Sequence, residues 1–188
     1  ARPGDAVLMS VLTRPRVDVA DAGVVPILVA VAVADALGDG VGVIWPNDLV
    51  IGGRKVCGIL CELGADESGV AWIVAGIGVN VHGVPAVADA RWRPGAVSTD
   101  AAPRRRHDVV CDVVTHLARR MDEWRDVGPG PALAAFAARD LLDGHGVTVT
   151  VGDHDVAGTA AGVDGQGRLV VHTPAGPQTL AAGEVTRV

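Results

Sequence analysis

The first half of the chain contains several short apolar runs and one longer apolar run. Ala6–Thr13 is a short run that predicts a buried strand. Val24–Leu37 is apolar on nearly every side, with Pro26 in its first turn and Gly38 just past its end, and it predicts a central helix. The shorter runs that follow are separated by turn residues. They predict a β-meander on a larger sheet, made of Val41–Trp45, Leu49–Ile51, Lys55–Leu63 and Val70–Val79.

Helical periodicity returns in the second half, after a stretch rich in Gly, Pro and Ala that predicts a loop over residues 81–103. Apolar residues spaced three and four apart in Arg104–Trp124 predict an amphipathic helix, and a shorter helix is predicted from Leu133 to Leu141. From about Asp143, short alternating segments between turn signals predict a small antiparallel barrel. The pattern as a whole predicts an α+β chain with packed helices on a mixed or antiparallel sheet.

Composition and charge narrow the functions that this chain can have. It has 188 residues, 49% hydrophobic and 20% charged, which is enough for a packed core. The net charge is −6 and the one basic run is Arg104–Arg106, so no nucleic-acid partner is expected. The longest uncharged apolar run, Val24–Ala34, is too short for a bilayer, and no membrane partner is expected. Three cysteines and no secretory leader predict a cytoplasmic location.

Lysine is almost missing from the chain. Of the 16 basic residues, 15 are arginine and one is Lys55. A single lysine is either chance or a site that needs a compact ammonium rather than a planar guanidinium. Upstream of it, Trp45-Pro46-Asn47-Asp48 lies between two apolar runs, where Asn and Asp are ordinary turn residues. A hairpin of this length brings Asp48 close to Lys55, an arrangement that suits an anionic ligand carrying a metal.

Two glycines interrupt the last predicted strand of the meander, in Gly76-Ile77-Gly78-Val79-Asn80. Alternate glycines remove the side chains from one face of a strand, where a ligand can then lie against the backbone. The plainer interpretation is a bend in the strand followed by a turn asparagine. The segment lacks the third glycine and the following helix of a dinucleotide-binding fingerprint.

Taken together, three segments resemble the biotin protein ligases. The family motifs are Lys-Trp-Pro-Asn-Asp, Arg/Lys-Lys-x-x-Gly-Ile-Leu-x-Glu and Gly-x-Gly-x-Asn, and this chain has IWPNDL, RKVCGILCEL and GIGVN in the same order. The opening SVLTRP and the tail from about Gly144 are similar to the family as well. The resemblance implies a biotin/lipoate ligase-like catalytic domain at residues 1–142, N-terminally incomplete, and a small SH3-like β-barrel domain at 143–188.

The resemblance also implies a reaction in two steps. Biotin and ATP form biotinyl-5′-AMP with the assistance of Mg²⁺, and a lysine of a biotin carboxyl carrier protein of the acetyl-CoA carboxylase type then accepts the biotin. Lys55 would be the catalytic residue, and Asp48 would also approach the metal. The substrate and nucleotide would be bound by Trp45, Asn47, Asp48, Gly58, Gly76, Gly78, Asn80 and Arg187. Some relatives dimerise through the catalytic-domain sheet, so a homodimer is among the expectations.

The sequence departs from the family pattern in two ways. Ile44 stands where the family has a lysine, and replacing it by lysine is expected to improve ATP affinity. The Gly-Arg-rich loop of the family is absent. An N-terminally incomplete chain would also lack strands and helices that cover the sheet, so apolar surface is expected to be exposed. These departures keep a second hypothesis open, a degenerate protein that binds biotin or its adenylate without catalysis. A lipoate ligase and an α/β domain without a ligand are further alternatives.

Overall fold

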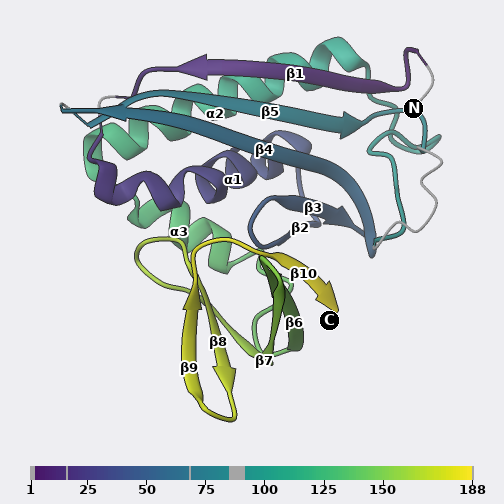
Figure 1. Cartoon of the computed structure of the whole chain (residues 1–188). Coiled ribbons are helices and arrows are strands. Elements are labelled where there is room, and N and C mark those ends of the chain that lie inside the picture. The colour runs from purple at the N-terminus through teal and green to yellow at the C-terminus, as the bar shows by residue number, and fades with distance from the viewer. Residues whose placement is uncertain (1–2, 16, 68, 85–91, 188) are drawn as a thin grey trace.

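Two antiparallel sheets and a layer of helices make up the chain (Figure 1). The structure is a computed structural model that describes residues 3–15, 17–67, 69–84 and 92–187. Within these residues there are ten β-strands, three α-helices and one 3₁₀ helix. The helices lie against one face of the first sheet, and the second, smaller sheet lies below them in Figure 1.

The first sheet has the strand order β1-β5-β4-β3-β2, with every neighbouring pair antiparallel. Its strands confirm the runs predicted from the sequence, with boundaries that shift by up to three residues. They are β1 (Ala6–Thr13), β2 (Val41–Ile44), β3 (Asp48–Ile51), β4 (Arg54–Asp66) and β5 (Gly69–Asn80). The order places β4 between β3 and β5, so the three motif-bearing strands are neighbours in space.

Alternation along the strands separates a covered face from an open one. On β5, Ile73, Ala75, Ile77 and Val79 are buried under the helices, because successive side chains of a strand point to opposite sides. On the other side of the same strand, Gly76 and Gly78 leave the backbone partly exposed. We call this outward side of β1, β5 and β4 the open face.

The predicted central helix is confirmed as α1 (Val25–Leu37), which follows a 3₁₀ helix, η1 (Val19–Val24). Pro26 lies in its first turn and Gly38 ends it with φ 99°. The 19 residues of η1 and α1 are long and apolar enough to cross a membrane by length and composition, but 61% of the most apolar window is buried in the structure. That burial is typical of the core helix of a folded domain.

The other two helices are α2 (Arg106–Val127) and α3 (Gly130–Ala137). The shorter helix was predicted to reach Leu141, and that boundary is wrong. The chain leaves the helix at Ala138, because the backbone of Val43 on β2 donates to Arg139 and accepts from Leu141, at 2.8 and 3.0 Å. A pairing with a strand almost a hundred residues away leaves no mark on the local apolar spacing.

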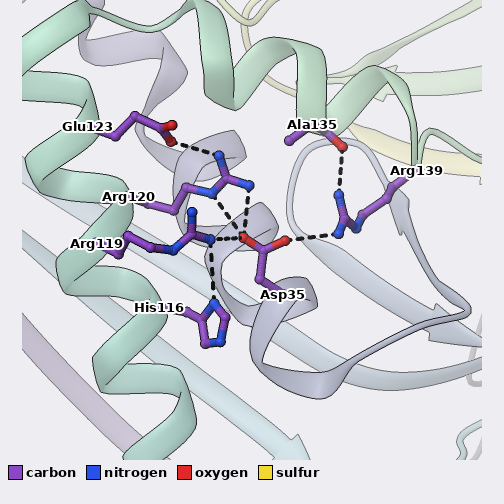
Figure 2. Close-up of polar contacts among 7 residues, drawn as sticks. All are labelled: Asp35, His116, Arg119, Arg120, Glu123, Ala135 and Arg139. Carbon is purple, nitrogen blue, oxygen red and sulfur yellow. Dashed lines mark hydrogen bonds and ion pairs between the residues drawn. The ribbon is translucent and has the colours of Figure 1, made fainter.

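A buried carboxylate joins the helical layer (Figure 2). Asp35 of α1, whose side chain is 9% exposed, accepts from Arg119 and Arg120 of α2 and from Arg139, at 2.8–2.9 Å. Arg120 also pairs with Glu123 at 2.7 Å. A buried pair of this kind adds little net stability, but removing one partner leaves charges unpaired and costs about 3–5 kcal/mol. Asp35 therefore fixes the position of α1, α2 and the segment after α3 relative to one another.

The second sheet has the order β10-β6-β7-β8-β9 and is antiparallel throughout, as predicted for the tail. Among the described strands, β10 and β9 lie at its two edges. The bounds are β6 (Gly146–Val151), β7 (His154–Val163), β8 (Leu169–Thr173), β9 (Gly176–Leu180) and β10 (Glu184–Arg187). The division of the chain at residue 142 stays a prediction.

Candidate functional site

Three motif residues stand in one row across the first sheet. Asp48 on β3 is paired with Gly58 on β4, and Gly58 is paired with Gly78 on β5. The row continues to Leu8 on β1. Because a sheet places paired residues on the same face, residues from the three segments that sequence reasoning singled out lie on one side of the sheet.

Lys55 and Asp48 form an ion pair at the edge of this row. The ammonium Nζ of Lys55 lies 2.6 Å from Oδ1 of Asp48, with side chains that are 36% and 20% exposed. The hairpin between β3 and β4 produces the approach, as its length predicted. A pair that is open to solvent in this way contributes little to folding, so both groups can be redirected to a ligand at small cost.

The main chain of Lys55 is held by a segment that sequence reasoning assigned to a loop. The backbone N–H of Lys55 donates to the carbonyl of Arg93, and the N–H of Gly95 donates to the carbonyl of Lys55, both at 2.8 Å. Pro94 lies opposite Lys55 as an isolated parallel bridge. These bonds give Lys55 a strand neighbour on its second side and fix the backbone from which its side chain extends.

Asn47 mainly forms hydrogen bonds that hold the turn in place. Its side-chain amide donates to the carbonyl of Ile59, and its backbone carbonyl accepts from the N–H of Ile59 at 3.2 Å. Its own N–H donates to Ile44 at 3.1 Å. The two bonds with Ile59 attach the turn to β4, the third closes the turn onto Ile44, and the carboxamide oxygen of Asn47 remains to meet a ligand.

Cys57 lies beside the ion pair but is inert as a nucleophile. Burial raises the pKa of its thiol from 9.0 to about 12; the negative charge of Asp48 adds to this shift and the ammonium of Lys55 opposes it. Burial also raises the pKa of Cys61 to about 12. A thiol that stays protonated at neutral pH does not attack a phosphate or an anhydride.

A cavity of about 440 Å³ opens over the ion pair, within the range of 300–1,000 Å³ that is typical of small-molecule sites. Beside it lies a second hollow of about 360 Å³ over β1 and β5, which shares Gly76 with the first. The larger cavity is lined by Pro46, Asn47, Asp48, Lys55, Gly58, Ile59, Leu60, Gly76, Gly183 and Glu184. Its wall is thus polar near Lys55 and bare backbone near the glycines.

Several predicted site residues lie elsewhere. Trp45 is 2% exposed, and its indole N–H donates to the carbonyl of Gly167 at 3.0 Å, away from the cavity wall. Gly78 lines the second hollow rather than the first. Asn80 ends β5, with its side-chain amide 3.5 Å from the carbonyl of Lys55. Arg187 is in β10 opposite Thr148, and its side chain lies outside the described part of the structure.

Two residues of the wall lie outside every motif that sequence reasoning singled out. Gly183 lies just before β10 in the second sheet and Glu184 is the first residue of that strand, yet both line the same cavity as Lys55. More than 120 residues separate them from the motif, so no spacing along the sequence relates them to it. The one local signal is a glycine just before a short strand, and glycine is a common turn residue.

Ile44 occupies the position where the family has a lysine, and it is 3% exposed at the end of β2. In this chain the position is part of the core. A lysine introduced here would place its ammonium among buried neighbours before it could reach a phosphate. The replacement is therefore expected to lower stability rather than to improve ATP affinity.

The side chains near Lys55 suit a Mg²⁺ ion that is held partly by substrate phosphates better than a metal held entirely by protein side chains. Over the residues described, no group of three or more His, Cys, Asp and Glu side chains is placed to hold an ion. The carboxylate of Asp48 faces the cavity, and Mg²⁺ is commonly held by one or two carboxylates together with phosphates of a substrate. Asp48 therefore fits a metal that arrives with a nucleotide.

Comparisons with known proteins agree with this geometry. Residues 1–80 match the model of the biotin/lipoate A/B protein ligase family, and residues 144–187 match the biotin protein ligase C-terminal domain. A biotin--[acetyl-CoA-carboxylase] ligase of Paracoccus denitrificans is 30% identical over 94% of this chain and 78% of its own length. The bifunctional ligase/repressor BirA of Bacillus subtilis is 26% identical over 98% of this chain and 59% of its own length.

A solved structure has the same fold. The biotin protein ligase of Aquifex aeolicus in complex with biotin and ATP superposes with a TM-score of 0.79 at 20% identity, covering 98% of this chain and 79% of that one. The similarity in sequence and in fold extends over nearly the whole chain, and the strands that carry the motifs are neighbours in one sheet. The chain belongs to the biotin protein ligase family of enzymes.

Proposed function

We propose that this chain joins biotin to ATP as biotinyl-5′-AMP and transfers the biotin to a lysine of a biotin carboxyl carrier protein. One observation carries the proposal: Lys55, Asp48, Asn47 and the backbone at Gly58 and Gly76 line a single cavity. A cation, a carboxylate and bare backbone in one cavity match the charged and the apolar ends of the two substrates.

The glycine backbone is the proposed biotin floor. Gly76 belongs to both hollows, and Leu8 and Leu60, which are 84% and 67% exposed, stand on either side of it. A flat, apolar bicyclic ring would lie over this floor, with its carboxylate pointing toward Lys55. Covering the two leucines with the ring would remove apolar surface from water, which favours binding by about 25 cal/mol per Å².

In the first step, an oxygen of the biotin carboxylate attacks the α-phosphorus of ATP. A new P–O bond forms, the bond between the α-phosphorus and the bridging oxygen breaks, and pyrophosphate leaves. Lys55 would turn from Asp48 to the oxygens that gather negative charge, which a positioned cation stabilises in the transition state. Magnesium, when bound at Asp48, supplies charge neutralisation for the phosphates.

In the second step, the amine of a carrier lysine attacks the carbonyl carbon of the mixed anhydride. A C–N bond forms, the bond between the carbonyl carbon and the phosphate oxygen breaks, AMP leaves and the amine loses a proton. Asn47, Asn80 and Arg187 are proposed contacts of the nucleotide during both steps. The proposed location is the cytoplasm, and a homodimer is the proposed assembly.

The test is biotin-dependent exchange of pyrophosphate into ATP, followed by transfer of biotin to a carrier domain. The proposal expects both activities, and expects Lys55→Ala to lose both. The chain should be assayed alone and with the upstream segment of the Paracoccus relative supplied. Absence of exchange in both assays, with the chain folded, would overturn the proposal.

The buried Ile44 favours a second candidate, a protein that binds biotinyl-5′-AMP without making it. Calorimetric titration with a non-hydrolysable analogue of the adenylate separates the two. Tight binding together with no exchange identifies the non-catalytic binder. Binding together with exchange identifies the ligase.

A further inference from the structure

The turn between β7 and β8 contacts the motif segment of the first sheet through one buried hydrogen bond. The indole N–H of Trp45 donates to the carbonyl of Gly167 at 3.0 Å, across 122 residues of sequence. Trp45 is directly followed by Pro46, Asn47 and Asp48, all of which line the cavity. The second sheet therefore holds the residue from which the cavity wall extends.

The turn that provides this carbonyl is rigid. Asp164 accepts hydrogen bonds from the backbone N–H groups of Gln166 and Arg168, at 2.9 and 3.0 Å. Its other oxygen pairs with the guanidinium of Arg168 at 2.6 Å. An aspartate that caps its own turn in this way fixes where the Gly167 carbonyl points.

The same turn packs backbone to backbone against the start of α1. A Cβ added at Gly167 would lie 2.8 Å from the carbonyl oxygen of Gly23 and 3.2 Å from Cα of Val24. A Cβ added at Gly23 would lie 2.5 Å from the carbonyl oxygen of Gln166. Glycine at both positions lets the two backbones approach closely enough for the Trp45 hydrogen bond to form.

We propose that Gly167 is a positioning residue for the nucleotide side of the site, acting through Trp45 on Asn47 and Asp48. This inference rests on the proposed function for its kinetic consequence, but its structural step stands separately. The simpler alternative is that Gly167 only satisfies a buried indole donor, as buried Trp side chains usually require. The two differ in whether moving the turn disturbs Asp48 and Lys55.

The chain offers a matched pair of substitutions. Gly167 has φ 76° and Gly162 on β7 has φ 69°, so alanine is strained to a similar extent at both. A Cβ at Gly162 meets nothing within 4 Å, whereas a Cβ at Gly167 pushes the turn away from α1. Gly167→Ala therefore tests displacement of the turn, and Gly162→Ala controls for backbone strain in the same sheet.

The first readout is hydrogen exchange of the indole N–H of Trp45. Four Trp residues give four indole signals in a ¹⁵N NMR spectrum, and Trp45→Phe identifies the one that matters. Gly167→Ala is expected to accelerate exchange of this proton by about tenfold or more, which corresponds to the loss of one net hydrogen bond. Gly162→Ala is expected to leave it at the parent rate.

The second readout is acylation of Lys55, the only lysine side chain in the sequence, by an amine-reactive ester, followed by mass spectrometry. If the turn positions Asp48, Gly167→Ala loosens the ion pair and raises the rate of Lys55 acylation, while Gly162→Ala does not. Neither variant should alter the rate for a free amine added to the same solution. A merely structural role for Gly167 predicts equal rates in the two variants.

The third readout is pyrophosphate exchange. Gly167→Ala is expected to raise the KM for ATP by about tenfold, because a small misplacement of binding groups is costly. The KM for biotin is expected to rise less. Equal indole exchange and equal Lys55 acylation in the two glycine variants would overturn the inference. Absence of pyrophosphate exchange by the parent chain, both alone and with the upstream segment supplied, would overturn the proposed function instead, and the first two readouts would still decide the positioning role.

Discussion

Lys55 and Asp48 face each other across the β3–β4 hairpin, with Nζ and Oδ1 2.6 Å apart at the mouth of the glycine-floored cavity. Each partner keeps the other in place while the cavity holds no anion. An incoming carboxylate or phosphate competes with Asp48 for the ammonium, and a cation accompanying the phosphates compensates Asp48. The pair is thus a resting arrangement of the two groups that the proposed reaction uses.

Replacing Lys55 should remove activity without unfolding the chain. Lys55→Ala is expected to lower the rate of pyrophosphate exchange about 10²–10³-fold, the usual cost of removing one donor from a preorganised anion site. Lys55→Arg is expected to fail as well, since a planar guanidinium does not replace a compact ammonium. Because the pair is partly exposed, the free energy of unfolding should change by less than about 1 kcal/mol.

The control for this variant is Arg105→Ala, which removes a surface cation just before α2 from its pair with Asp108. It should leave exchange unchanged. Exchange kinetics and thermal melting of the three variants provide the measurement. Full activity in Lys55→Arg would contradict the role given to Lys55.

Filling the glycine floor should weaken biotin and spare ATP. A Cβ at Gly78 would lie 3.4 Å from the Leu8 side chain, an ordinary contact, so Gly78→Ala should fold as the parent does. The added methyl occupies the space assigned to the biotin ring. Overpacking of about 1–3 kcal/mol would raise the KM for biotin roughly tenfold or more, with the KM for ATP unchanged.

The matched control is Gly146→Ala at the start of β6, where a Cβ meets nothing within 4 Å. Steady-state exchange kinetics with each substrate varied in turn distinguish the cases. Equal biotin KM values for Gly78→Ala and the parent would place the biotin elsewhere.

The fold was predictable where its signals are local. Neighbouring residues in the sequence predict the lengths of the strands, the end of the central helix at Gly38 and the hairpin that joins Asp48 to Lys55. The structure confirms all three. The contacts of Arg93 with Lys55 and of Gly167 with Trp45 were missed. Each joins segments that only the folded sheets bring together.

The same reasoning accounts for the errors in detail. The end of α3 depends on the pairing of Arg139 with Val43, and the direction of the Trp45 side chain depends on a carbonyl of the second sheet. Glu184 reaches the cavity because the second sheet lies beside the first, a position that no motif in the chain indicates.

Ile44→Lys should destabilise the chain rather than improve ATP affinity. The family pattern alone favours a gain, but Ile44 is 3% exposed, and a buried ammonium without a partner costs several kcal/mol. The melting temperature should therefore fall by several degrees, and the KM for ATP should not decrease. Ile44→Met keeps the apolar volume and serves as the control for packing. Unchanged melting together with a lower KM for ATP would show that the ammonium reaches the phosphates.

Stability should fall at alkaline pH because of the buried thiols. Cys57 and Cys61 titrate near pH 12 in the folded chain, against 9.0 as the ordinary value. The unfolded chain therefore loses these protons first, and above pH 9.0 it is stabilised relative to the folded one. The expected loss is about 1.4 kcal/mol per pH unit for each thiol between these two values, with none below pH 8.

Urea unfolding at a series of pH values measures this slope. Cys57→Ala should reduce it, although the cavity it leaves lowers stability at every pH. Cys111→Ala, which removes an exposed thiol, should leave the slope as it is. A parent whose stability is constant from pH 9 to 11 would contradict the raised pKa values.

The open face should promote self-association. Leu12 and Trp72 project from it at 54% and 38% exposure, and exposed apolar surface favours burial against another molecule. Leu12→Gln is expected to shift the chain toward the monomer in sedimentation velocity over a concentration series. Val127→Gln replaces an apolar residue that is 68% exposed at the end of α2 and should have no such effect. A parent that is monomeric at every concentration would contradict a homodimer formed through this face.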